Sequence, residues 1–349
     1  MSASNLGHRR IQPSCRVLDK RSDCHPTSTT RKVARMKVAN AILARVVFIL
    51  MLLYSLTHGM RGNAQETQPD QVWLEPPRPT ATQSTWYPQA IETVSGEIAE
   101  FDAKRMVLQN RQTKQQRVVA AARVLWVEVG AKDKQQSLAI EQFMKGGFNE
   151  SLRSLLETLK QRPPIWQQQW LSMMAAQAAW RSGRAAIAIK LVEQLDRRPL
   201  PPLVLAWLPV AWSSSRVESE TRKVADDQLD NPSPAVRLIA ASWLLSSDRR
   251  DAAAQTLAGL SRDNARPEIA KLAEVLRWRT TAPPDIARQA TRWQEKLDAL
   301  PLVMQVGPTI TLMERFEAGG LTAEATRLRL SLQKTPPHPH PDLINFPPR

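Results

Sequence analysis

Residues 163–199, PPIWQQQWLSMMAAQAAWRSGRAAIAIKLVEQLDRRP, decide the fold of this chain of 349 residues. A stretch rich in apolar residues and glutamine precedes Gly183, and a second apolar stretch follows it. Glycine permits a tight turn between antiparallel helices, and proline is favoured where a helix begins because its missing N–H needs no partner there. The stretch therefore predicts a pair of antiparallel helices that is closed by Pro199.

The closing proline recurs along the chain. Pro163, Pro199, Pro232, Pro267, Pro301 and Pro336 are separated by 36, 33, 35, 34 and 35 residues. Such a period indicates a helical-repeat array, in which each unit buries its apolar face on its neighbours. We therefore expect a mainly α fold, a right-handed α-solenoid of about six helical hairpins. The expected hairpins are residues 134–162, 163–198, 199–231, 232–266, 267–300 and 301–335.

Three of these units share a second pattern, a glycine followed five residues later by a small or aliphatic residue and sixteen residues later by proline. The matching residues are Gly147, Leu152 and Pro163, then Gly183, Ala188 and Pro199, and finally Gly320, Ala325 and Pro336. This pattern resembles the tetratricopeptide repeat, whose unit has 34 residues. The resemblance covers residues 134–335, and it implies that the first helices line a groove that recognises a protein or peptide.

Four side chains on the expected first helices are candidates for partner binding: Gln167, Trp170, Gln177 and Arg277. The repeats also hold most of the tryptophans of the chain, which has eleven. Two interpretations of these tryptophans remain open. They pack between stacked hairpins, or together with arginines such as Arg277 they contact an extended peptide or a glycan.

Residues 199–212, PLPPLVLAWLPVAW, are apolar on every side and contain Pro209. A helix that is apolar all round is buried, and a proline inside it produces a kink. This stretch therefore predicts a buried, kinked helix near the middle of the array.

Apolar and polar residues alternate between residues 91 and 130, which is typical of strands separated by turns. We expect a small antiparallel β module at residues 89–131. Gly96 in one strand and a turn at Asp102 resemble the small Sm-type or Src-homology-type barrels, and the resemblance implies a structural cap or a protein-contact module. Residues 65–88 are rich in proline and glutamine and predict a flexible linker.

Two ends of the chain have their own composition. Residues 1–64 contain a basic stretch, the apolar run 46–56 and Gly62-Asn63-Ala64, an order typical of a signal peptide, with Met36 as the expected start. A membrane anchor is the open alternative, and either indicates export to the periplasm or cell envelope. The tail, residues 336–349, is rich in proline and is expected to be disordered, with His338 and His340 in it.

The net charge of +15 would favour nucleic acid, but residues 1–64 carry +9 of it. The remaining +6 suits an anionic polysaccharide or a membrane surface, and nucleic acid is not an expected partner. Between residues 65 and 337 the sequence has neither histidine nor cysteine, which excludes most nucleophilic and metal catalysis.

We therefore expect no catalytic residue, no metal site and no cofactor, and interpret the chain as an exported, non-catalytic scaffold or adaptor that binds a protein or peptide. One alternative is a cell-envelope glycan hydrolase, because such enzymes use paired carboxylates. The carboxylates considered for it are Glu218, Glu220, Asp226 and Asp227.

Overall fold

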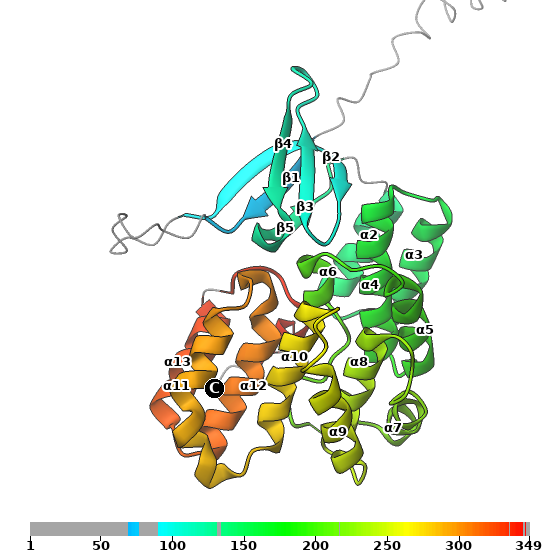
Figure 1. Cartoon of the computed structure of the whole chain (residues 1–349). Helices are drawn as coiled ribbons and strands as arrows, with labels where there is room; N and C mark the ends of the chain where they lie inside the picture. Colours follow the sequence, from blue (N-terminus) through cyan, green and yellow to red (C-terminus); the bar gives the residue numbers. More distant parts are fainter. Residues whose placement is uncertain are drawn as a thin grey trace, which may run out of the picture. The chain divides into compact units, whose positions relative to one another are not determined.

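The computed structural model describes residues 69–76, 90–130, 134–215, 217–334, 336–344 and 346. All of them belong to one compact unit, Thr67–Arg349. The described chain is mainly helical and has one small antiparallel sheet, as the sequence predicts (Figure 1). The expected signal peptide or anchor lies outside the described residues, and among those described no helix combines the length and apolar character needed to cross a bilayer.

The sheet has five antiparallel strands in the order β4-β3-β2-β1-β5. They are β1 Asp70–Leu74, β2 Glu92–Phe101, β3 Arg105–Gln109, β4 Gln116–Ala120 and β5 Val124–Glu128. The turn between β2 and β3 is made by Asp102, whose Oδ1 accepts hydrogen bonds from the N–H groups of Lys104 (2.7 Å) and Arg105 (2.9 Å). Aspartate favours turns for this reason, and strands β2 to β5 fall inside the module expected at 89–131.

Strand β1 corrects the expectation of a flexible linker over residues 65–88. Residues 70–74 lie inside the sheet, between β2 and β5, and Val72 and Leu74 are fully buried. Asp70 fixes the start of this strand, because its two carboxylate oxygens accept hydrogen bonds from the N–H groups of Ile98 (3.1 Å) and Gly130 (3.0 Å). The short strand has only two inward-facing apolar residues, too weak a pattern to be distinguished from its proline-rich surroundings.

Each of the six expected hairpin ranges contains two α-helices. The pairs are α2 Lys134–Met144 with α3 Phe148–Lys160, α4 Ile165–Arg181 with α5 Ala185–Leu195, α6 Pro202–Ala206 with α7 Ser219–Asp226, α8 Pro234–Leu244 with α9 Arg250–Leu260, α10 Pro267–Arg277 with α11 Pro283–Asp298, and α12 Val306–Ala318 with α13 Thr322–Lys334. Short 3₁₀ helices η1 Ala121–Arg123, η2 Trp278–Thr280, η3 Leu302–Met304 and η4 Pro341–Leu343 complete the described elements.

Five of the six periodic prolines lie at the start of a helix or up to three residues ahead of one. Pro267 is the first residue of α10 and Pro301 directly precedes η3. Pro163, Pro199 and Pro232 lie two or three residues ahead of α4, α6 and α8, and Pro336 follows α13. This distribution follows from the absent N–H of proline, which is tolerated in the first turn of a helix and not in its interior.

Glycine supplies the tight turns in three pairs. Gly183 (φ +75°) and Gly320 (φ +77°) adopt the left-handed conformation expected of them. In the first pair Gly146 (φ +80°) takes that role instead of Gly147, which caps the start of α3 and has a negative φ. The small residues expected on the second helices, Ala188 and Ala325, are buried.

The third pair departs from the others. Helix α6 ends at Ala206, and residues 207–212 are not helical, so the kinked helix expected over 199–212 is wrong beyond Ala206. Pro209 cannot donate the hydrogen bond that a continuing helix would require. The main chain of residues 207–212 finds other partners, which are described below.

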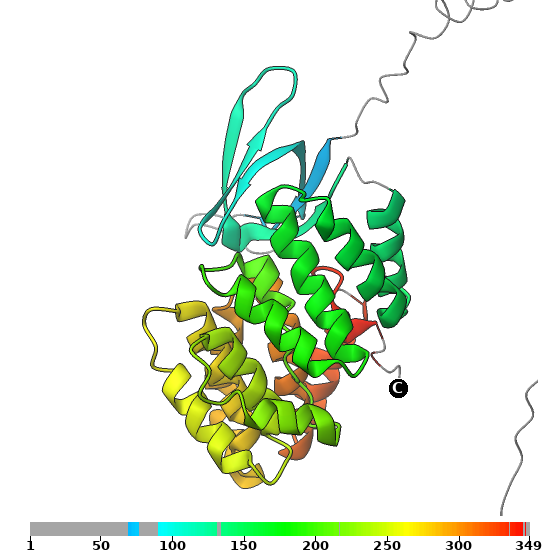
Figure 2. The same cartoon turned by 90° about the vertical axis from the view of Figure 1, so that its right-hand side faces the viewer.

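The sheet contacts the helices through β5 and η1, which lie against α6 and η3 (Figure 2). Trp126 of β5 meets Trp170 of α4 edge to face, with ring centroids 5.4 Å apart. Trp207, which follows α6, lies 4.6 Å from Trp170 and 5.8 Å from Trp126. The three indoles join the sheet to the helices in one apolar core, as large aromatic side chains commonly do.

Candidate functional site

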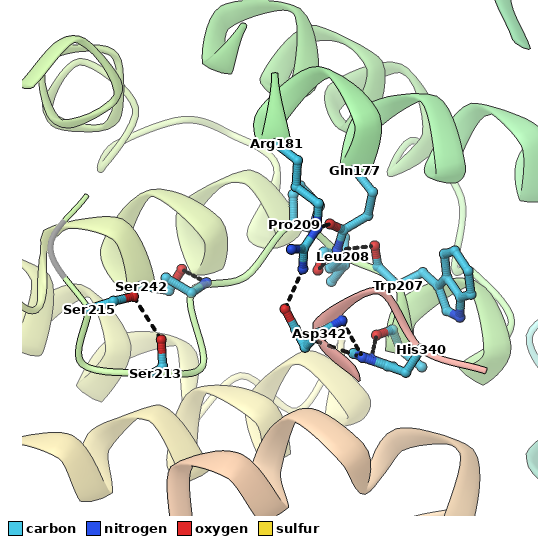
Figure 3. Close-up of polar contacts among 12 residues, drawn as sticks. Gln177, Arg181, Trp207, Leu208, Pro209, Ser213, Ser215, Ser242, His340 and Asp342 are labelled. Carbon is cyan, nitrogen blue, oxygen red and sulfur yellow. Dashed lines mark hydrogen bonds and ion pairs between the residues drawn. The ribbon is translucent and has the colours of Figure 1, made fainter. Parts of the chain in front are cut away.

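A non-helical segment of the chain is held among the helices by side chains from four other helix pairs. We call residues 207–212, WLPVAW, the captured segment. Gln177 Nε2 donates to Trp207 O (3.0 Å) and Leu208 O (2.9 Å) (Figure 3). Trp243 Nε1 donates to Pro209 O (2.8 Å), Arg279 Nη1 to Ala211 O (2.7 Å) and Thr311 Oγ1 to Trp212 O (2.7 Å). Ala211 N in turn donates to Ser242 Oγ (3.0 Å).

The holders of the captured segment come from corresponding places in the pairs. Gln177 lies on α4, Ser242 and Trp243 on α8, and Thr311 on α12, each the first helix of its pair. Arg279 lies in η2, directly after the first helix α10. Buried main-chain groups must be hydrogen-bonded to be tolerated, so the first helices and η2 together provide the side chains that pair with this non-helical main chain.

Arg279 is the only charged member of this set among the described residues. Its side chain also reaches Ser242 O (3.3 Å) and Ser246 Oγ (2.8 Å). Burial lowers the pKa of the Arg279 guanidinium to about 10, with the cations of Arg250 and Arg315 acting in the same direction and Glu314 opposing them. Arg279 therefore remains a cation at neutral pH, and its hydrogen bonds to carbonyl oxygens are charge-assisted.

Three of the four predicted partner-binding residues are interior. Gln177 is 0% exposed and holds the captured segment, while Trp170 is 4% exposed within the indole cluster. Gln167 is 6% exposed and donates to Gln136 Oε1 (2.7 Å). Their expected role as groove contacts is therefore corrected, because other parts of the same chain cover them. Arg277 is exposed and lines a separate groove between α10 and α11.

The expected disordered tail is also corrected. His338 and His340 are buried; His338 Nε2 lies 2.7 Å from Val303 O and His340 Nε2 lies 2.9 Å from Ala206 O. Asp342 forms a 2.5 Å ion pair with Arg181 at the end of α4 (Figure 3). The hydrogen bonds between the imidazoles and the carbonyl oxygens hold this proline-rich segment in place although it contains few apolar residues. The partners lie far away in the sequence, so no local pattern predicts them.

We call residues 336–346 the C-terminal segment, and burial controls the charge of its titratable side chains. It lowers the pKa of His338 below its ordinary value, although hydrogen bonds to Pro339 and Val303 act against it. It lowers the pKa of His340 further, assisted by His338 and by Arg181. Burial raises the pKa of the Asp342 carboxyl group, and Arg181 opposes that shift. The folded segment thus favours neutral imidazoles.

A cleft of about 540 Å³ opens beside the end of the captured segment, and we call it the central cleft. It lies between the end of α4, residues 211–221, α12 and the C-terminal segment. Its apolar walls include Trp180, Trp212, Ile310, Met313, Val217 and Phe346. Its charged lining residues are Arg181, Glu218, Glu314, Glu317, Arg329 and Asp342.

Most carboxylates in and near the central cleft have partners. Glu317 pairs with Arg329 (2.6 Å), and Glu314 Oε2 accepts a hydrogen bond from Ser214 N (2.7 Å). Among the acids considered for hydrolysis, Glu218 lines the cleft, whereas Asp226 pairs with Arg249 (2.7 Å) outside it. Within the described residues no group of three or more His, Cys, Asp or Glu side chains is arranged to hold a metal ion.

Sequence reasoning did not identify three of the polar residues that organise this site, Ser242, Thr311 and Asp342, and it placed His338 and His340 in a disordered tail. With Arg279, each of these residues acts on a group 35 or more residues away or, for Ser242, 31 residues away. The local signals in the sequence were the run Arg277-Trp278-Arg279 and the alternation of proline and histidine in residues 336–341. Comparison with protein-family models, with curated proteins and with solved structures finds no match to this chain.

Proposed function

We propose that the chain is an exported, non-catalytic scaffold or adaptor whose helical hairpins form an α-solenoid that binds an extended segment of a partner protein. The single observation behind this proposal is the captured segment. Side chains from α4, α8, η2 and α12 bond its main chain from Trp207 to Trp212. These side chains are therefore chemically equipped to hold the main chain of a polypeptide.

Main-chain recognition is a general way to bind peptides, because the hydrogen-bonding groups of the backbone are the same in every sequence. In this chain, the captured segment already occupies part of the hydrogen-bonding side chains that the first helices offer to a main chain. At its end, Ala211 and Trp212 form one side of the central cleft, so a partner segment entering the cleft would continue along the same face.

The central cleft supports a short peptide as its ligand. Its volume of about 540 Å³ falls in the range typical of binding pockets, about 300–1,000 Å³. Trp180, Met313 and Phe346 offer apolar contact area in the cleft. Arg181 and Glu218 also line it, and their charges would fix the orientation of a bound peptide. This mixture of apolar walls and a few polar groups is what a specific pocket requires.

The test is retention of envelope proteins on the purified chain at high salt, compared with a blocked variant. Val217→Trp would fill the cleft from a partly exposed position, and Ile187→Trp places the same side chain at an exposed position of α5 outside the cleft. We expect a discrete protein to be retained by the wild type and by Ile187→Trp and lost with Val217→Trp. Equal retention by both variants would overturn the proposal.

A second candidate is hydrolysis of envelope glycans. Glu218 and Glu314 line the same cleft as Trp180 and Trp212, and acids beside aromatic walls are the groups that glycosidases use. Turnover of a polysaccharide by the wild type, lost in Glu314→Gln and in Glu218→Gln, would support this candidate. Turnover that survives both substitutions would eliminate it.

A further inference from the structure

A second concave surface lies away from the central cleft, between α10 with η2 on one side and α11 on the other. It encloses about 600 Å³ and is lined by Arg277, Arg288, Arg292 and Lys296. Two acidic side chains, Glu274 and Asp285, line it as well. We call it the basic groove. It shares no lining residue with the central cleft.

The acids in the groove neutralise only half of its cations. Lys296 is paired with Glu274, and Arg288 with Asp285.

Arg277 donates to the neutral hydroxyl of Ser261 (3.2 Å), and Arg292 makes no hydrogen bond or ion pair within the described part of the chain. Both guanidinium groups are exposed and have no carboxylate partner there. The groove therefore presents two positive charges that no carboxylate of the described chain neutralises.

The cations of α11 are arranged in a way that the fold does not require. Arg288, Arg292 and Lys296 follow one another at intervals of four residues, so they form a stripe about 12 Å long on one helix face. Asp285 and Glu274 offset the charges at the two ends of this stripe, and the charge of Arg292 in its middle has no such partner in the described chain. An anionic ligand along the groove would supply it.

The walls of the groove indicate which anion fits. Trp278 and Trp293 stack with ring centroids 5.2 Å apart and are only 4% and 5% exposed, so they stiffen the groove but do not offer a free ring face. A single-stranded nucleic acid needs exposed rings on which its bases stack. The polar lining residues Thr280 and Gln289 instead suit hydroxyl groups.

We propose that the basic groove binds an acidic polysaccharide, with its carboxylate or sulfate groups on Arg277 and Arg292 and its hydroxyl groups on the neighbouring polar side chains. Arginine is suited to this role because its planar guanidinium donates two parallel hydrogen bonds to such anions. The groove is separate from the peptide site, so this inference does not depend on the proposed function.

The test measures binding of the full chain to dextran sulfate as a function of salt, with uncharged dextran as the reference. The variant Arg277→Gln/Arg292→Gln removes the two unpaired cations. The control Arg153→Gln/Arg327→Gln removes two exposed arginines from α3 and α13, outside the groove, and lowers the net charge equally. Thermal unfolding of both variants verifies that each is folded.

We expect the groove variant to bind dextran sulfate at least about 10-fold more weakly and with a shallower salt dependence, since fewer counterions are released. The control variant should bind within about 2-fold of the wild type. An equal loss in both variants, or no binding of dextran sulfate by the wild type, would overturn the proposal. Preferential binding of duplex DNA or of anionic lipid vesicles through the same two arginines would show that the occupant is wrong.

Discussion

The guanidinium of Arg279 donates a 2.7 Å hydrogen bond to the carbonyl oxygen of Ala211, 68 residues earlier in the chain. This bond joins the fifth helix pair to the captured segment. Arg279→Leu would leave that carbonyl unpaired, and a buried unpaired polar group costs about 1–3 kcal/mol. We expect the free energy of unfolding, measured by urea denaturation, to fall by about 2 kcal/mol. In the exposed neighbour, Arg277→Leu should change it by less than about 0.5 kcal/mol, and an equal effect of both would contradict the role of Arg279.

Gln177 holds the captured segment at its other end. Its amide donates to Trp207 O and Leu208 O, so Gln177→Leu keeps the approximate side-chain volume but leaves two buried acceptors without that donor. We expect a loss of about 2 kcal/mol in the free energy of unfolding. Gln255→Leu on the exposed side of α9 is the matched control and should be near neutral. A stable Gln177→Leu protein would show that these bonds do not hold the segment.

Two glycines in helices should respond to alanine with opposite signs. A Cβ at Gly307 of α12 would lie 2.3 Å from ring atoms of Trp212, whereas a Cβ at Gly259 of α9 would meet no atom within 4 Å. Overpacking costs about 1–3 kcal/mol, and replacing a helical glycine by alanine gains about 1 kcal/mol where space allows. Thermal unfolding should therefore show Gly259→Ala stabilised and Gly307→Ala destabilised. The same sign for both substitutions would contradict the close approach of α12 to Trp212.

Acid should loosen the C-terminal segment. Burial lowers the folded-state pKa of His338 and His340 below the unfolded value of 6.5, so their neutral forms favour the folded segment above that pH. This contribution is lost as the pH falls from about 7 towards the lowered values. The raised pKa of Asp342 acts in the opposite sense at lower pH, because protonation of that carboxyl group becomes easier in the folded state. Further charged groups face the segment: Arg181 pairs with Asp342, Glu128 lines the pocket beside the two histidines, and Arg329 lies over the ring of Phe346 (5.8 Å).

Limited proteolysis and tryptophan fluorescence can follow this release, since Trp207 lies 6.3 Å from His340 between ring centroids. We expect cleavage within residues 336–349 to accelerate between pH 7 and pH 5. The variant His338→Asn/His340→Asn, which removes both imidazoles of the segment, should show a much flatter pH profile in that range. An unchanged pH dependence in this variant would assign the effect to other residues.

The helix pairs were predictable because their limits depend on local chemistry. Pro267 begins α10 and Gly183 makes the turn after α4 for reasons that lie within a few residues of each. The sheet strands β2 and β3 were predictable in the same way, from alternation and from the side chain of Asp102.

The candidate site was predicted poorly because its residues act across long sequence distances. Gln177 and Trp170 were recognised as notable side chains of α4, but their burial depends on Trp207, which the sequence places in a different unit. Arg277 was identified and is exposed, yet its position in the basic groove depends on the packing of α11 against α10. Local patterns carry no information on which distant element covers a given helix face.

By itself, the amino-acid sequence determined the ranges of the six helix pairs and that the chain is mainly helical with a small antiparallel β module. Those properties follow from backbone freedom at glycine, the missing donor of proline and the periodicity of apolar residues. Only the tertiary structure decided that residues 70–74 are a strand, that residues 207–212 are not helical and that the histidine segment is buried. Each of these segments depends on hydrogen bonds or packing from distant residues, because none has a local pattern strong enough to select its conformation.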